Sequence, residues 1–514
     1  MPYVAHVVRA GQEGLLPTGF LLYDLAFYMA VAREHFDGGG FRLLYGLPFS
    51  PSYSTPAIYF QPHTLVLGLL WRATGLDPGV VFVLFGAAAA WLCARLALAL
   101  YRELVGLQDT ADRLGLLAFA WGGGLLVLAG LLVFWIRGGG VTELLTFEPL
   151  FTLDPWDGWW FLSFGRNLVL PTEAVYHALF FGVVLGILRR RYRLAAALAL
   201  VLVLTHPFTG AELTAIVLAW LALEALLRSG AVPRGFGLAY VGVAGIQAAY
   251  YGVFLRRFEE HRAVLQQYDA HPWLLDNASL LPAYLPVACL AAWNFRSVAH
   301  ARRYLAAPPH RLLLVWFLVA LALEKHELVM RPVMPLHFTR GYVWTALFLM
   351  GAPVLVGLLR RLLTRSRRAA GIAVAAGILV LFLADNALWL GTYPWRPSGW
   401  RQAIYLHPAE RDVLDHLGAA GPPGSVVAAQ TRKLGYLTTV YTPLRSWYAH
   451  HLVTPHAEAR AEELRRFFAT GAAPPAWRDL PLLVVMFRQE ADPRRGWGEP
   501  VYANGGFAVF RPRP

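Results

Sequence analysis

Long apolar stretches separated by short polar segments dominate the middle of this chain. They cover residues 78–101, 113–135, 171–188, 193–209, 211–227, 234–254, 278–294, 311–330, 340–359 and 369–390. Each stretch approaches the roughly 20 residues that an α-helix needs to cross the apolar core of a bilayer. The pattern therefore predicts an all-α polytopic membrane bundle of about ten spans over residues 78–390.

The segment before these stretches has a different pattern. Two stretches, 24–37 and 57–74, are amphipathic or interrupted by polar residues, and glycines and prolines fill the chain between them. Helices of this kind lie on a membrane surface instead of crossing it. We therefore expect residues 1–77 to form a large outer loop that carries two interfacial helices.

The chain after Trp400 changes character again, because its apolar runs shorten and its polar residues increase. The predicted elements are a helix over 407–418, a strand over 426–429, helices over 432–440 and 456–469, a strand over 482–487 and a hairpin that turns at Asn504-Gly505-Gly506. Alternating helices and strands are typical of an α/β domain. Residues 391–514 are therefore expected to form a small α/β domain.

Charge assigns the two sides of the membrane. The chain is 57% hydrophobic and only 15% charged, and its net charge of +13 comes largely from arginines clustered within 189–193, 296–311 and 360–368. These clusters alternate with the spans as cytoplasmic loops do, and they form no continuous basic groove for nucleic acid. The predicted outer segments are 1–77, 136–170, 255–277, 324–339 and 391–514. They hold most of the acids and histidines, so we expect a multi-pass cell-membrane protein with its chemistry on the extracytoplasmic side.

A carboxylate motif stands out on the first outer loop. Asp24 is followed at helical spacing by Tyr28, Ala32 and Arg33. The next interfacial helix opens with Tyr59-Phe60-Gln61-Pro62-His63. Spacing alone leaves two interpretations open. Asp24 either stabilises the free amides at a helix start or acts as a catalytic base.

In these residues the chain resembles the GT-C superfamily of integral-membrane glycosyltransferases, especially the bacterial mannosyl- and aminoarabinose-transferase type. Asp24, Tyr28 and the pair Ala32-Arg33 match the family motif of an acid, a tyrosine and Ala-Arg. Leu25 stands where the family usually has a second acid, and Gln61 replaces the basic residue of a Lys-Pro-Pro-like turn. The resemblance covers about the first 210 residues well and the rest loosely.

The resemblance implies transfer of a sugar from a polyprenyl-phosphate donor by an inverting single displacement. Asp24 would be the general base that deprotonates the acceptor hydroxyl. The residues that would line the acceptor site or cavity are Tyr28, Arg33, Gln61, His63, Glu173 and His177. The partners would be a lipid-linked sugar, an extracytoplasmic glycan, lipid or protein acceptor, and membrane lipids. The family also has a span before this loop, which we expect to be missing from this chain. The alternative function is a polytopic transporter or flippase of lipid-linked or small substrates.

The second outer loop supplies further carboxylates. Glu148, Asp154 and Asp157 lie within it, and the resemblance puts another acid of the active centre in this region, for which we favour Asp154. Carboxylates are also the ligands of a hard cation, so a divalent ion such as Mg²⁺ or Mn²⁺ is the cofactor to consider. An exposed acidic loop is the alternative. Glu173 and His177, one helical turn apart, either bind a metal together or hydrogen-bond in the bundle.

Two other outer segments contain basic residues that could bind the donor phosphate. His337 and Arg340 are three residues apart at the start of a span, and arginine binds phosphate through two parallel hydrogen bonds. Arg256 and Arg257 are weaker candidates. The alternative is interfacial anchoring. The stretch 445–456 contains several histidines without a metal-binding spacing, and a basic, aromatic-rich surface is sufficient to explain it.

Overall fold

The computed structural model describes most of the chain, in two compact units. The described residues are 2–37, 40–50, 56–154, 160–161, 163–364, 368–393, 395–396, 403–422, 424–491 and 499–512. One unit, called here the bundle unit, comprises residues 86–252 and 272–401. The other, called the mixed unit, comprises residues 2–85, 253–271 and 402–514.

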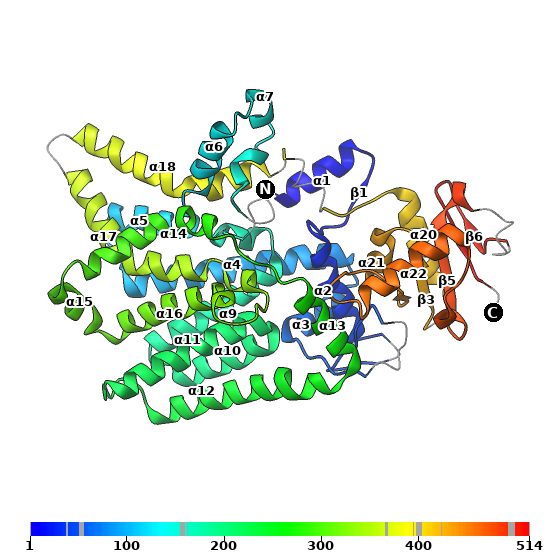
Figure 1. Cartoon of the computed structure of the whole chain (residues 1–514), viewed down its shortest axis with the longest axis horizontal. Helices are drawn as coiled ribbons and strands as arrows, with labels where there is room; N and C mark the ends of the chain where they lie inside the picture. Colours follow the sequence, from blue (N-terminus) through cyan, green and yellow to red (C-terminus); the bar gives the residue numbers. More distant parts are fainter. Residues whose placement is uncertain are drawn as a thin grey trace. The chain divides into compact units, whose positions relative to one another are not determined.

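Helices make up the bundle unit, with α4 continuing into it from the mixed unit. Their bounds are α4 Pro78–Leu104, α5 Thr110–Trp121, α6 Leu126–Ile136, α7 Val141–Leu144, α9 Pro171–Leu188, α10 Tyr192–Thr205, α11 Pro207–Leu226, α12 Arg234–Gln247, α14 Asn277–Ala292, α15 Val298–Leu305, α16 Pro308–Glu324, α17 Tyr342–Thr364 and α18 Arg368–Thr392. Short 3-10 turns η1 Glu148–Phe151, η2 Phe164–Leu168 and η7 Pro335–Phe338 join some of them. Figure 1 shows α9 to α12 side by side, and α17 contacts α5, α14, α16 and α18.

Several of these helices are long and apolar enough to cross a membrane. Within the described residues seven pass this test, and two bent helix pairs, α5 with α6 and α15 with α16, raise the number to nine. The predicted span 193–209 is the shorter helix α10. Large apolar side chains remain exposed on the long helices, such as Trp91 at 66%, Leu238 at 75% and Val380 at 64%. Apolar surface of this extent suits lipid, so the all-α multi-pass bundle predicted from the sequence is confirmed.

The charged ends of the bundle helices are consistent with a single orientation. Arg189 follows the last residue of α9, whereas Glu173 lies in its first turn. Arg361 lies in the last turn of α17, whereas Arg340 comes just before its first residue. A helix of 18 residues such as α9 is about 27 Å long. The arginine clusters and the buried polar residues therefore occupy opposite ends of the same helices.

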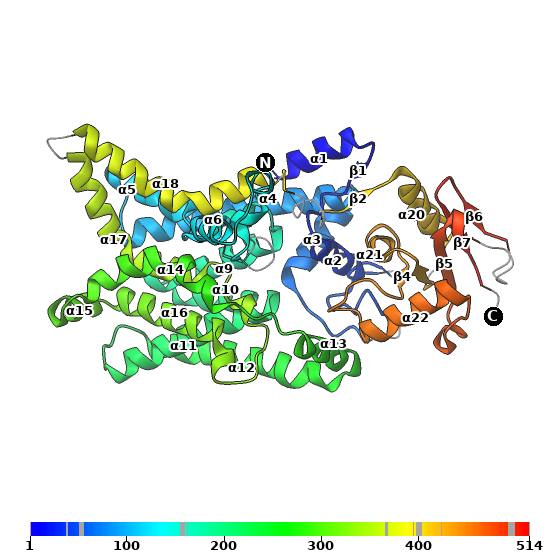
Figure 2. The same ribbon diagram turned by 45° about the horizontal axis from the view of Figure 1, so that its top comes forward.

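The mixed unit combines the predicted outer loop with the carboxyl-terminal domain. Its helices are α1 Pro2–Gln12, α2 Tyr23–Glu34, α3 Pro62–Thr74, α13 Glu259–Ala270, α20 Pro408–Ala420, α21 Arg432–Tyr441 and α22 Ala457–Thr470. Its strands are β1 Leu16–Pro17, β2 Tyr405–Leu406, β3 Val426–Ala429, β4 Arg445–Ser446, β5 Leu482–Phe487, β6 Tyr502–Ala503 and β7 Phe507–Phe510. Figure 2 shows the sheet in orange and red beside α20 and α22. The predicted small α/β domain is confirmed.

The main sheet of this unit has the strand order β4-β3-β5-β7-β6. Strand β3 pairs in parallel with β4 and β5, and β7 pairs antiparallel with β5 and β6. One face of β3, β5 and β7 packs in a core with Leu464 and Phe467 of α22 and with Trp447 and Trp477. Burial on this scale gives the domain its own hydrophobic core.

Helix α2 is fastened to the α/β domain by buried polar contacts. The Arg445 guanidinium donates through Nη2 to the Glu34 carboxylate at 2.8 Å and through Nη1 to the Leu47 carbonyl at 2.6 Å. The Arg33 guanidinium donates to the Val440 carbonyl at 3.2 Å. A buried guanidinium group is stable only when acceptors satisfy its N–H groups. These contacts therefore fix α2 against α21 and β4.

Candidate functional site

Asp24 lies in the first turn of α2, as the sequence predicted, but it does not cap the helix. The position before α2 is Leu22, which makes no side-chain capping bond. The Asp24 carboxylate instead pairs through Oδ1 with Nε2 of His450 at 2.9 Å. Its side chain is 56% exposed, and no other described residue donates a hydrogen bond to it. The carboxylate is thus held at one oxygen, while the other has no donor among the described residues.

His450 is itself firmly placed by the loop after β4. Its Nδ1 accepts the backbone N–H of Leu452 at 3.0 Å, and its carbonyl accepts the N–H of Thr454 at 2.9 Å. The ring is 6% exposed and packs near Tyr436 at 5.6 Å and Phe27 at 6.2 Å between centroids. The histidine therefore has one orientation toward α2.

The surroundings of Asp24 favour its ionised form. The protein around Asp24 displaces part of the water near its carboxylate, and this desolvation, the largest single influence, raises the pKa. The hydrogen bond from His450, with smaller contributions from His451 and Arg432, outweighs this desolvation and holds the pKa of Asp24 below its usual value. The carboxylate is consequently ionised at neutral pH, which is the form a general base requires.

The other predicted residues of the first outer loop lie in the same unit. Tyr28 follows one turn after Asp24, and its ring meets the His63 ring edge-on at 5.4 Å. Burial lowers the pKa of His63 to about 3, so this ring is neutral. Arg33 is paired with Asp37 at 3.0 Å, in addition to its contact with α21. The side-chain oxygen of Gln61 is buried and accepts no hydrogen bond from the described residues.

Arg256 and Arg257 occupy the 3-10 turn Leu255–Arg257, also in the mixed unit. Both are exposed, and their carbonyls accept hydrogen bonds from the Arg262 guanidinium at 3.1 and 2.9 Å. Nearby in sequence, Nδ1 of His261 lies 3.1 Å from the hydroxyl of Tyr59. The two arginines are available at a surface, and their predicted role in phosphate binding stays a prediction.

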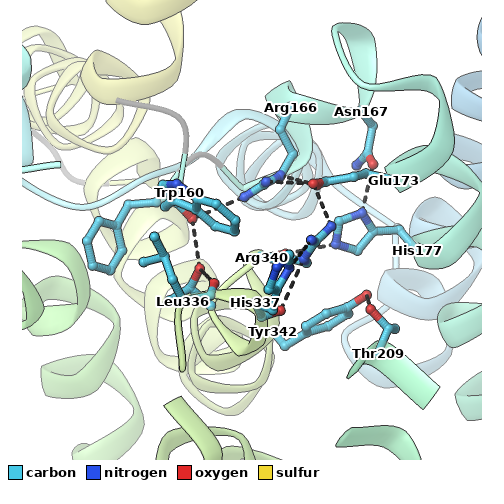
Figure 3. A network of polar contacts seen from close by, with 12 residues as sticks. Trp160, Arg166, Asn167, Glu173, His177, Thr209, Leu336, His337, Arg340 and Tyr342 are labelled. Carbon is cyan, nitrogen blue, oxygen red and sulfur yellow. Dashed lines mark hydrogen bonds and ion pairs between the residues drawn. The ribbon is translucent and has the colours of Figure 1, made fainter. Parts of the chain in front are cut away.

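A buried ion network occupies one end of the bundle unit (Figure 3). Glu173 of α9 pairs with Arg166 of η2 and with Nη1 of Arg340 at 2.6 Å. The side chains of Arg166, Glu173 and Arg340 are only 2%, 8% and 6% exposed. Arg166 and Arg340 thus share the Glu173 carboxylate. Isolated charges are not tolerated at such burial, which explains why these residues converge.

His177 contacts this network without hydrogen-bonding to Glu173 among the described residues. Its Nδ1 lies 2.7 Å from Oδ1 of Asn167, and its Nε2 lies 2.8 Å from the Arg340 carbonyl. Because a carbonyl only accepts, Nε2 carries the proton. Rotating the Asn167 amide by half a turn would let its NH₂ group, otherwise without a partner among the described residues, donate to Nδ1. A neutral His177 is then fully satisfied beside two arginines.

His337 and Arg340 are brought together as their spacing predicted. Nη2 of Arg340 contacts Nδ1 of His337, and Nε of Arg340 donates to the His337 carbonyl at 3.1 Å. The His337 ring stacks on Phe208 at 4.5 Å and on Trp273 at 5.4 Å. Both side chains are thus positioned at the same bundle end as Glu173, but Arg340 already serves partners within the protein.

The described acids of the second outer loop form no cation site. Asp154 is buried, and its two oxygens accept the backbone N–H groups of Trp160 and Phe161 at 3.1 and 2.9 Å. Burial raises the pKa of Asp154 to about 7. Glu148 begins η1, and Asp157 lies outside the described residues. No group of three His, Cys, Asp or Glu in the described residues is arranged to hold a metal. Oxygens aimed at N–H donors do not fit a divalent ion, so the described residues give no support to a metal site.

Two contributors were missed from the sequence. His450 was treated as part of a basic, aromatic surface, and Arg166 was not singled out at all. Asp24 and His450 are 426 residues apart, and Glu173 and Arg340 are 167 apart. The one local signal was the run of histidines after β4, which has no spacing typical of a site.

Comparison with known proteins gives structural similarity only. No protein-family model and no curated protein matches the chain. ArnT from Cupriavidus metallidurans in the apo state is 14% identical over 97% of this chain and 95% of that chain, with a TM-score of 0.48. The same protein bound to undecaprenyl phosphate is 14% identical over 95% and 93%, also with a TM-score of 0.48. The archaeal oligosaccharyltransferase AglB from Archaeoglobus fulgidus, with an inhibitory peptide and a dolichol-phosphate, is 12% identical over 97% and 71%, with a TM-score of 0.43.

Proposed function

We propose that this chain is a membrane glycosyltransferase of the GT-C type. It transfers a sugar from a polyprenyl-phosphate donor to an extracytoplasmic acceptor with inversion, and Asp24 is the general base. The observation that carries the proposal is the Asp24 carboxylate, which is 56% exposed, ionised, and bonded at a single oxygen. An ionised carboxylate with one oxygen that no described protein group occupies can accept a proton from a ligand hydroxyl.

The chemistry follows from that arrangement. The unoccupied oxygen of Asp24 accepts the proton of an acceptor hydroxyl while that hydroxyl attacks the anomeric carbon of the donor. General-base assistance of this kind contributes about two to four orders of magnitude in rate. The buried, unpaired acceptor oxygen of Gln61 in the same unit supports an additional contact to a ligand hydroxyl or amine.

Phosphate recognition is assigned to the bundle cluster. Arg340 and His337 are in contact at one bundle end, where Arg166 and Arg340 share the Glu173 carboxylate. Charge-assisted hydrogen bonds from arginine to phosphate are among the strong ones in proteins. Arg256 and Arg257 are the second candidates, because they are exposed and basic.

The test is donor consumption by the purified full chain. Wild-type protein is incubated with a panel of radiolabelled polyprenyl-phosphate sugars and a membrane-extract acceptor fraction, and product formation is measured. Asp24→Asn is expected to lose about 100-fold or more in turnover while it retains donor binding. The matched control is Asp412→Asn, which changes an exposed aspartate of α20 in the same unit.

Two results would refute the proposal. Turnover of Asp24→Asn close to that of the wild type would remove Asp24 from the base role. A wild type that consumes no donor of the panel, but moves a lipid-linked or small substrate across reconstituted vesicles, would establish the transporter alternative instead.

A further inference from the structure

The stretch after β4, which the proposed function leaves without a role, contains the one described residue that hydrogen-bonds to Asp24. The geometry points to His450 as the positioning residue of the base: a neutral imidazole of the carboxyl-terminal domain that orients the Asp24 carboxylate and leaves one oxygen free for the acceptor. This inference rests on the proposed function.

The tautomer of His450 follows from its two contacts. The backbone N–H of Leu452 can only donate, so Nδ1 of His450 holds a lone pair and no proton. The remaining ring proton is on Nε2, which donates to Oδ1 of Asp24 at 2.9 Å. Adding a second proton to Nδ1 would break the Leu452 bond. The ring therefore acts as a fixed neutral donor.

A neutral donor suits a carboxylate that must accept a proton. A permanent cation at the same place, such as an arginine, would stabilise the ionised form more strongly and weaken the base. His450 instead occupies Oδ1 with one neutral hydrogen bond and fixes the plane of the carboxylate. Oδ2 accepts no hydrogen bond within the described residues, and 56% of the Asp24 side chain is exposed.

The rigidity of the histidine supports a positioning role. Its ring is 6% exposed and stacks on His451 at 5.0 Å, near Tyr436 at 5.6 Å. The backbone on either side is tied, since Thr454 donates to the His450 carbonyl at 2.9 Å. Functional groups must be held within about 0.5 Å of the productive geometry by neighbours that are themselves locked. The loop after β4 satisfies this requirement for Asp24.

In the proposed transfer, Asp24 takes the acceptor proton and the donor phosphate leaves with the bonding electron pair. The acceptor O–H proton passes to Oδ2 of Asp24 as the new bond from that oxygen to the anomeric carbon forms. The bond from the anomeric carbon to the phosphate oxygen breaks, and its electron pair leaves with the polyprenyl phosphate. Asp24 ends as a carboxylic acid and returns its proton to water. His450 keeps its Nε2 proton throughout.

The first test is steady-state kinetics of His450→Ala and His450→Gln in the full chain. His450→Ala is expected to lower kcat about 10- to 100-fold with little change in KM. His450→Gln, whose amide N–H can reach Asp24, is expected to recover kcat to within about threefold of the wild type. His271→Ala, at a 59% exposed histidine of the same unit, is the control.

The second test separates positioning from a structural role. Loss of the His450 hydrogen bond raises the pKa of Asp24, so the acidic limb of the pH–rate profile should move to higher pH in His450→Ala. The other charged or titratable groups that interact with Asp24 are His451, Arg432, Tyr436 and Tyr268, and the variant leaves them unchanged. A wild-type kcat, or a loss that only follows the unfolded fraction with an unmoved limb, would overturn the inference.

A third measurement does not depend on activity. Nitrogen-15 NMR of histidine-labelled protein should show His450 as the Nε2–H tautomer, and its Nε2 signal should shift in Asp24→Asn. A protonated Nδ1 would overturn the pairing even in an active enzyme. If no donor of the panel is consumed, the proposed function fails while the NMR result still decides whether His450 orients Asp24.

Discussion

Asp24 and Glu173 are both carboxylates predicted to be functional, yet their environments are opposite. The Asp24 side chain is 56% exposed and has a single neutral partner on one oxygen. The Glu173 side chain is 8% exposed and is paired with two buried guanidinium groups. The first can exchange a proton with a ligand without breaking the fold. The second holds helix ends together.

The difference in burial predicts which carboxylate matters for stability and which for activity. A buried ion pair contributes little net stability, but removal of one partner leaves an uncompensated charge and costs about 3–5 kcal/mol. An exposed carboxylate can be altered at little cost to the fold. A large functional effect with a small stability effect is therefore expected at Asp24, and the reverse at Glu173.

The largest effect on stability is expected for Glu173→Ala. This change leaves Arg166 and Arg340 buried without their carboxylate. It should lower the free energy of unfolding by about 3–5 kcal/mol, seen as a large fall of the thermal unfolding midpoint in detergent. Glu143→Ala, at an exposed position of the short helix α7, should change it by less than about 1 kcal/mol. Equal midpoints for the two variants would contradict the buried network.

The second effect is a dependence of stability on pH through Asp154. Its pKa is raised to about 7 in the folded chain, against about 3.9 in an unfolded one. The folded state binds more protons between these values, so this stability is fully present below about pH 4. It is lost as the pH rises through 7, by about 2 kcal/mol or more.

Thermal unfolding between pH 5 and 8 checks this expectation. Asp154→Asn has no carboxyl group to titrate, so its stability should fall less steeply with pH than that of the wild type. Burial also raises the pKa of Glu34 to about 7, and the difference between variant and wild type isolates Asp154. Identical slopes would show that Asp154 does not titrate in this range.

The third effect concerns donor affinity at the bundle cluster. Arg340→Lys keeps a positive charge but loses the planar group that reaches Glu173 and His337 together. It should weaken polyprenyl-phosphate binding by about 1–3 kcal/mol, measured by titration in detergent. Arg360→Lys, at the exposed end of the same helix, should leave affinity unchanged. Unchanged affinity for polyprenyl phosphate in both Arg340→Lys and His337→Ala would exclude this clamp and leave Arg256 and Arg257 as the candidates.

The smallest effect on stability is expected for Asp24→Asn. Asparagine keeps an oxygen that accepts the Nε2 proton of His450, and the side chain is largely exposed. The free energy of unfolding should change by less than about 0.5 kcal/mol. A loss comparable to that of Glu173→Ala would place Asp24 among the structural carboxylates and erase the contrast between the two regions.

Local pattern was sufficient for many of the elements. Strands β3 and β5 have the predicted bounds, because each is a short run of apolar residues between polar segments. Helices α20, α21 and α22 begin within one residue of their predicted starts. The spans were recognisable because a bilayer requires one long apolar run for each helix.

The pattern of apolar and polar residues did not predict side-chain partners or breaks within helices. The predicted span 113–135 is two helices bent by 59°, which its hydrophobicity does not reveal. Glu173 and His177 share a helix face as predicted, yet Glu173 pairs with arginines of other segments. Asp154 was considered as a ligand, but it binds two backbone N–H groups of its own loop.

The sequence by itself determined the membrane bundle, the α/β domain and the place of Asp24 at the start of a helix. These features depend on periodicity and composition over short stretches, which each segment carries in its own residues. Only the tertiary structure decided that His450 meets Asp24 and that Arg166 and Arg340 share Glu173. Such pairs form because packing brings distant segments together, and buried charges and donors then select one another as partners.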